Sequence, residues 1–136
     1  MAKAMLKVMG GVEGLQVFQR AYRLSLEVHR ESLSWPKLEQ WGGVAEQLRR
    51  SSKSVCANLV EGGGRLARSR GEFGRYLIVA IGSADESRLW CRYAEDLGYI
   101  TAQHAQGWRA SFAEIARMLH GLLQSQTVQK PLLSDN

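Results

Sequence analysis

Apolar residues recur at steps of three and four along four segments of the chain, with polar residues between them. This spacing places the apolar side chains on one face of an α-helix, so each segment is predicted to form an amphipathic helix. The four stripes consist of Val17, Ala21, Leu24 and Val28; Trp41, Val44, Leu48, Val55 and Leu59; Phe73, Leu77, Ala80, Ala84, Cys91 and Ala94; and Trp108, Phe112, Ile115, Leu119 and Leu122. No segment sustains an alternation of apolar and polar residues, so no strand is expected.

Residues that start or stop helices agree with the ends of these stripes. Pro36 is expected to end the first helix, because the residue before a proline is pushed out of the helical region. Ser69 and Glu72 have the spacing of a capping box and are expected to start the third helix. Gly98 stands where a helix ends on a left-handed residue, and Thr101 can cap the fourth helix.

Long amphipathic helices joined by short connections favour antiparallel neighbours. We therefore predict an all-α fold, an antiparallel up-and-down four-helix bundle that spans residues 14–125. Residues 1–13 are expected to form a flexible N-terminal segment, and residues 126–136, which lose the apolar periodicity, a flexible C-terminal tail. With 136 residues, 45% of them hydrophobic, the chain has enough apolar material for one such domain.

The third helix carries a second row of large side chains beside its stripe, formed by Tyr76, Val79, Trp90 and Tyr93. One interpretation is a wide core that absorbs this row. The other is an interface between copies of the chain, because large aromatic rows are uncommon on the surface of a monomer. We favour the interface and predict a homo-oligomer.

Three consecutive glycines, Gly62 to Gly64, interrupt the pattern of the second helix. Phosphate-binding loops place glycines between a strand and a helix, in the patterns G-x-x-x-x-G-K-[ST] or G-x-G-x-x-G. Neither pattern is present here, and no strand is expected. We therefore predict that the second helix ends at this run and that the chain reverses into the third helix, with glycine accepting a positive φ.

The positive charge of the chain is concentrated around these glycines. Seven of the 18 basic residues and two of the 13 acidic residues lie between positions 49 and 75, so this segment carries the whole net charge of +5. The seven are Arg49, Arg50, Lys53, Arg65, Arg68, Arg70 and Arg75. Such a concentration is typical of an anion-binding surface. A solvated basic surface that only aids solubility is the alternative, and composition does not separate the two.

Residues able to carry out catalysis or bind a metal are scattered along the chain. His29, His104 and His120 lie far apart along the chain and lack the spacing of a metal site. Cys56 and Cys91 have no companion histidine and are expected to be buried, reduced thiols. We therefore expect no catalytic site, no metal site and no cofactor.

The apolar runs are too short for a membrane protein. None approaches the roughly 20 residues that a membrane-spanning helix needs. The opening segment, MAKAMLKVMGGVEG, is also too short and too weakly apolar for a signal peptide. We expect a cytoplasmic protein with no membrane partner.

Three segments together resemble a known family: residues 58–62 (NLVEG), 72–77 (EFGRYL) and 82–100 (GSADESRLWCRYAEDLGYI). The chain is similar to the four-helix bundle proteins named after the intervening sequences of 23S ribosomal RNA, over roughly residues 15–123. The accessory variability proteins of diversity-generating retroelements are similar in fold. Arg49, Arg50 and Lys53 match the R-R-x-x-K/S helix of the family, and Arg65 matches the basic residue after its glycines.

The resemblance implies a bundle that assembles as a ring-like homopentamer, without a known active site or metal. It also implies, through the retroelement branch, nucleic-acid binding on a basic surface and a reverse transcriptase as partner. Our leading hypothesis is a non-enzymatic oligomeric scaffold that binds RNA or DNA phosphates through the seven basic residues. In its most specific form, the hypothesis makes the protein an accessory to a reverse transcriptase. The alternative is a protein-interaction module without nucleic-acid binding. An enzyme such as a nuclease is disfavoured, because no carboxylate cluster or metal-ligand spacing supports it.

Overall fold

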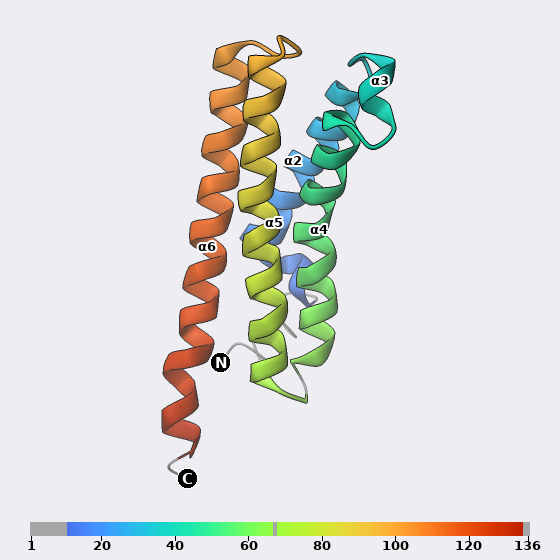
Figure 1. The fold of residues 1–136 in the computed structure, drawn as a ribbon. Helices are drawn as coiled ribbons and strands as arrows, with labels where there is room; N and C mark the ends of the chain where they lie inside the picture. The colour runs from blue at the N-terminus through green and yellow to red at the C-terminus, as the bar shows by residue number, and fades with distance from the viewer. Residues whose placement is uncertain (1–10, 67, 135–136) are drawn as a thin grey trace.

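The computed structural model describes residues 11–66 and 68–134, with side chains as far as Gln126. Four long helices form a bundle: α2 (Gln16–Ser32), α4 (Val44–Arg65), α5 (Arg70–Asp96) and α6 (Ala102–Ser134). A 3-10 turn, η1 (Val12–Gly14), precedes the bundle, and a one-turn helix, α3 (Lys37–Gln40), lies between α2 and α4. Successive long helices run in opposite directions (Figure 1), and the described residues contain no strand. The predicted all-α bundle of four helices is confirmed.

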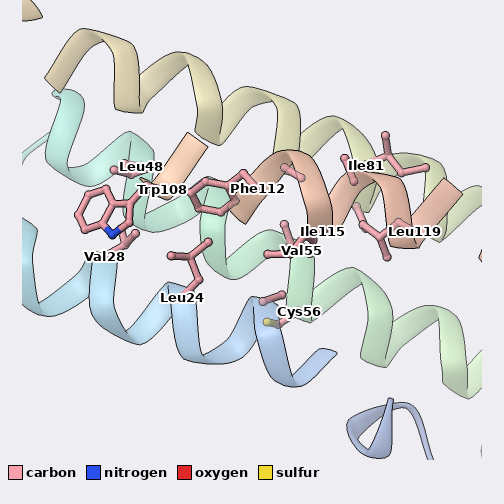
Figure 2. Packing of buried hydrophobic residues seen from close by; sticks show 14 of the residues in the cluster. Leu24, Val28, Leu48, Val55, Cys56, Ile81, Trp108, Phe112, Ile115 and Leu119 are labelled. Carbon is pink, nitrogen blue, oxygen red and sulfur yellow. The ribbon is translucent and has the colours of Figure 1, made fainter. Parts of the chain in front are cut away.

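The four apolar stripes meet inside the bundle and form one core. All six stripe residues of α5 are fully buried, and on α6 the side chains of Phe112, Ile115 and Leu119 are at most 1% exposed. Leu24 and Val28 of α2 lie on the opposite side of this core (Figure 2). Burial of one large apolar side chain contributes about 1.5–3 kcal/mol. The stripes that predicted the helices therefore also hold them together.

Serines line part of the contact between α4 and α5. The hydroxyl oxygens of Ser51 and Ser87 lie 2.7 Å apart, and the Ser83 hydroxyl donates to the Ser54 hydroxyl at 2.8 Å. Small side chains let two helices approach closely, and paired hydroxyls avoid the cost of burying a polar group without a partner. Hydrogen-bonded serines thus continue the helix contact where the α4 stripe lacks an apolar residue.

The glycine run does not form the reversal that the sequence predicts. Gly62, Gly63 and Gly64 all lie inside α4, and the glycines with positive φ in the described part of the chain lie elsewhere. A Cβ at Gly62 would stand 2.7 Å from the Cβ of Tyr76, and a Cβ at Gly63 would stand 2.2 Å from a methyl carbon of Val12. The prediction of a glycine turn is therefore wrong: two of the glycines allow close packing, and the chain reverses just after them, between α4 and α5.

The first helix, expected to end at Pro36, already ends at Ser32, whereas three other predicted helix ends agree with the structure. The Ser69 hydroxyl accepts a hydrogen bond from the backbone N–H of Glu72 at 3.2 Å, and the Thr101 hydroxyl accepts one from the backbone of His104 at 3.1 Å. Gly98 has a φ of +82°. Its N–H donates to the carbonyl of Glu95, and the next N–H donates five residues back, which is the Schellman arrangement. Local sequence thus places these ends correctly.

Trp41, predicted to lie on the second apolar stripe, is not part of the core. It lies in the connection between α3 and α4, with 86% of its surface exposed. α4 begins only at Val44, whose backbone N–H donates to Oε1 of the buried Glu39 at 2.8 Å, and Gly42 has a φ of +78°. Because these two features separate Trp41 from the start of α4, the prediction for this residue is wrong.

Both ends of the bundle differ from the expected boundaries. Val12, assigned to the flexible N-terminal segment, is 7% exposed and belongs to the core, whereas residues 1–10 of that segment lie outside the described residues. α6 continues to Ser134 and so extends through most of the segment expected to form a C-terminal tail. The bundle therefore begins earlier and its last helix ends later than the apolar periodicity indicates.

Candidate nucleic-acid interface

The seven predicted basic residues fall into two separate groups. Arg49, Arg50 and Lys53 lie in the first half of α4, near α3, whereas Arg65 ends α4 and the remaining three lie beyond it. Arg49 and Arg65 are 16 residues apart in one helix, or about 24 Å at 1.5 Å per residue. The two groups therefore lie toward opposite ends of the bundle (Figure 1). The structure does not bring all seven together.

We call the group at the reversal the α4–α5 corner; it consists of Arg65, Arg68, Arg70 and Arg75. Arg68 and Arg75 are exposed, and the other two are partly exposed. None of the four forms an ion pair with an acidic side chain in the described part of the chain. By contrast, Arg92 pairs with Asp96 at 3.8 Å on the same helix. The corner thus presents several cations without internal partners.

Arg49 has a structural role that the sequence does not reveal. One of its terminal nitrogens donates to the Ser32 hydroxyl at 2.8 Å, and the other donates to the side-chain oxygen of Gln40 at 3.0 Å. Gln40 in turn donates to the backbone carbonyl of Ser32 at 2.8 Å. Arg49 therefore joins the end of α2 to α3 and α4. Its partners are distant in sequence, so only the tertiary structure shows this role.

Lys53 contacts a histidine from the neighbouring helix. Its ammonium group donates to Nδ1 of His29 at 2.9 Å. Burial, followed by the charges of Lys53, Arg49 and Arg30, lowers the pKa of His29 below its usual value. Two of these cations, Lys53 and Arg49, belong to the predicted group, so their charges add to the effect of burial on the pKa of His29.

A surface hollow of about 360 Å³ adjoins these residues. We call it the Trp41 hollow; it is lined by Leu33, Gln40, Trp41, Glu46, Arg49, Arg50 and Lys53. The sequence does not predict that Trp41 lines this hollow, because its apolar spacing places it on the stripe of the second helix. The glycine pair that follows Trp41 was the available signal, since glycines favour a connection over a helix.

The second row of α5 is only partly absorbed by the core. Val79 and Tyr93 are 51% and 47% exposed, whereas Tyr76 and Trp90 are partly buried. The rings of Trp90 and Tyr93 lie 5.5 Å apart between centroids. A wide core therefore does not account for this row, and Ile78, 57% exposed, extends the apolar surface.

The residues considered for catalysis or metal binding have other surroundings. Cys56 and Cys91 are free and buried, and burial raises the pKa of their thiols to about 11 and about 12. His104 packs edge-on against Trp108, with 4.5 Å between ring centroids. Within the residues that the structure describes, no three His, Cys, Asp or Glu side chains form a group able to hold a metal ion.

A buried carboxylate near α3 also has structural partners. Glu39 is 6% exposed, and its two oxygens accept hydrogen bonds from the Val44 backbone and the Tyr99 hydroxyl. The hydrogen bond to Glu39 is the main cause that raises the pKa of Tyr99. This carboxylate caps α4 and ties it to the segment before α6. It is therefore already engaged within the fold.

In the described part of the chain, no helix is both long and apolar enough to cross a bilayer.

Two comparisons relate the chain to known proteins. A family model described as 23S rRNA-intervening sequence protein matches residues 13–121. Among solved structures, the chain is similar to a protein of unknown function from the S23 ribosomal protein family of Bacteroides thetaiotaomicron, with a TM-score of 0.70 and 21% identity. The match covers 79% of this chain and 95% of that one, and at this identity it shows the fold alone. No curated protein matches the chain.

Proposed function

Because the chain belongs to the 23S rRNA-intervening sequence protein family, we propose that it is a non-enzymatic, homo-oligomeric scaffold that binds the phosphates of RNA or DNA through basic surfaces. In its most specific form, the proposal makes the chain an accessory protein to a reverse transcriptase, as the resemblance to retroelement accessory proteins implies. The observation that carries the proposal is the set of cations without acidic partners.

The arginines of the α4–α5 corner differ from several other surface arginines in whether a carboxylate lies near them. Arg20, Arg88, Arg92 and Arg117 each lie within 4 Å of a carboxylate, so their charges are partly neutralised inside the protein. The corner arginines have no such partner in the described part of the chain. A phosphate that approaches them therefore gains attraction without breaking an internal ion pair.

Assembly of several subunits would strengthen weak contacts at each corner. The partly exposed row of Tyr76, Val79, Trp90 and Tyr93 on α5 is our proposed subunit interface, because burying large apolar side chains between subunits is favourable. A ring of five subunits, the state that the resemblance implies, would present five corners to one nucleic acid. Binding at one corner would raise the effective concentration of the others.

The test is the salt dependence of binding in a variant that carries Arg65→Gln, Arg68→Gln and Arg70→Gln. Each lost phosphate contact lowers the log-log slope of affinity against salt by about 0.7–0.9. We therefore expect a lower affinity and a slope reduced by about 2–3 per subunit, with unchanged helicity and oligomeric state. Equal binding by the variant and the parent at every salt concentration would exclude the corner as the binding surface.

A matched control removes the same charge from cations that are already paired. Arg20→Gln, Arg92→Gln and Arg117→Gln replace three exposed arginines whose carboxylate partners lie within 4 Å. We expect this variant to keep most of the affinity and slope of the parent. A loss as large as in the corner variant would show that only the total charge matters.

The second candidate is a protein-interaction module that does not bind nucleic acid. The exposed row on α5 favours it as well, since an apolar surface can receive a different protein instead of another copy of this chain. In that case the corner arginines would meet acidic side chains of the partner. Absence of nucleic-acid binding by the parent, even at low salt, would favour this candidate.

A further inference from the structure

Trp41 is the most exposed of the large apolar side chains that the structure describes, at 86%. One exposed indole is not unusual by itself. Here, however, it lines a hollow of about 360 Å³ together with Leu33, which is 58% exposed, and with polar and charged groups. A concave surface with an aromatic wall and a few polar groups has the composition of a ligand site.

Hydrogen bonds hold the residues on both sides of Trp41. Gln40, just before it, accepts a bond from Arg49 and donates one to the last residue of α2 at 2.8 Å. Gly42, just after it, donates its backbone N–H to the Glu46 carboxylate. The backbone that carries the indole is therefore ordered before any ligand arrives. Less conformational entropy is lost on binding when the site is already in place.

The charge around the indole is mostly positive. Arg50 and Lys53 are exposed and three residues apart on α4, so they point to the same side of the helix. Arg49 adds a third cation to the lining, and Glu46 is the carboxylate that opposes them.

We propose that the Trp41 hollow binds one unpaired nucleotide of a single-stranded nucleic acid, with its base stacked on the indole and the adjacent phosphates beside Arg50 and Lys53. This inference rests on the proposed nucleic-acid binding and assigns it a substrate class. Stacking of bases on aromatic side chains beside cations is the general way in which proteins bind single strands without sequence preference. The α4–α5 corner would then provide a second contact for the phosphate backbone, about 24 Å along α4.

Other ligands fit the hollow less well. A base in a duplex stays paired and stacked on its neighbours, so its face cannot cover an indole. A bilayer would have to cover Glu46 and Gln40 together with Trp41, and placing a carboxylate in hydrocarbon is costly. An acidic peptide would satisfy Arg50 and Lys53 but would offer the indole a planar partner only through an aromatic side chain. An unpaired nucleotide offers both a planar base to the indole and phosphates to Arg50 and Lys53.

The test compares the full chain with Trp41→Ala in binding a labelled oligouridylate or oligothymidylate and a labelled duplex of equal length. Removing one stacked base contact should weaken single-strand binding on the order of 10- to 100-fold, and duplex binding less than about twofold. Trp41→Phe should retain most of the affinity, because an aromatic face remains. These variants should fold, since Trp41 is exposed and outside the core.

Leu38→Ala is the matched control, because Leu38 is 76% exposed on neighbouring α3 but does not line the hollow. It should leave single-strand binding unchanged. If Trp41→Ala also leaves it unchanged while the corner variant weakens nucleic-acid binding, the inference fails and the proposed function stands. If the parent binds no nucleic acid, both fail. If phosphatidylserine vesicles or an oligoglutamate peptide bind in a Trp41-dependent way and oligonucleotides do not, the hollow has another ligand and the inference is overturned.

Discussion

Replacement of Gly62 and of Gly64 by alanine should have opposite effects, although the two glycines lie two residues apart in α4. At Gly62, an added Cβ would lie 2.7 Å from the Cβ of Tyr76 and 3.1 Å from a ring carbon of Phe73, both on α5. The Tyr76 Cβ is attached directly to the backbone, so it cannot move unless α5 moves. At Gly64, no atom lies within 4 Å of the added carbon.

Two terms decide the size of each effect. Alanine is favoured over glycine in a helix interior by about 1 kcal/mol, and both positions, in the last turn of α4, gain at most this much. At Gly62 it is opposed by overpacking, which costs about 1–3 kcal/mol. Gly64→Ala should therefore stabilise the protein by roughly 0.5–1 kcal/mol, and Gly62→Ala should destabilise it by up to about 2 kcal/mol. The difference between the two variants isolates the steric cost.

The assay is urea unfolding followed by circular dichroism at one protomer concentration, because the stability of an oligomer depends on concentration. Two results would contradict the reasoning. Loss of stability in Gly64→Ala would indicate the glycine turn that the sequence predicts and the structure replaces with a helix. Gly62→Ala as stable as Gly64→Ala would mean that α4 and α5 do not approach as closely as 2.7 Å implies.

Three further predictions concern the cysteines, His29 and the α5 row. Because burial raises the thiol pKa of Cys56 to about 11 and of Cys91 to about 12, both should react slowly with a thiol reagent in the native protein and quickly once it is unfolded; rapid native labelling would contradict this. NMR titration should give His29 a pKa below 6.5, and Lys53→Gln should raise it by removing a nearby positive charge. Unfolded His29 takes up its proton at a higher pH than folded His29, so the contribution of His29 to the stability of the protein should be lost as the pH falls below about 6.5. A measured pKa of 6.5 or higher would refute this. Trp90→Glu should shift the protein toward smaller species in analytical ultracentrifugation, whereas a parent that sediments as a 15.2 kDa monomer would exclude the proposed interface.

The existence of the four long helices, and several of their ends, follows from the local sequence. Apolar spacing of three and four depends only on helix geometry, so it identifies the buried face before any partner is known. Caps likewise act between residues three to five apart, and Ser69, Gly98 and Thr101 are therefore found where the sequence predicts them. Charge content is also local information, and it assigns the net charge to residues 49–75.

The tertiary structure decided the features that depend on which residues of other elements contact a given side chain. Gly62 is read as a turn from its own sequence, but α4 continues through it, and α5 passes too close there for a side chain. Arg49 is one of seven cations in the sequence, but Ser32 and Gln40 come to lie against it and engage its donors. Trp41 matches the apolar period, yet the break before α4 leaves it exposed, beside Arg50 and Lys53. Periodicity describes one helix at a time, whereas the close approach of two helices and the hydrogen bonds between elements exist only once the helices have packed.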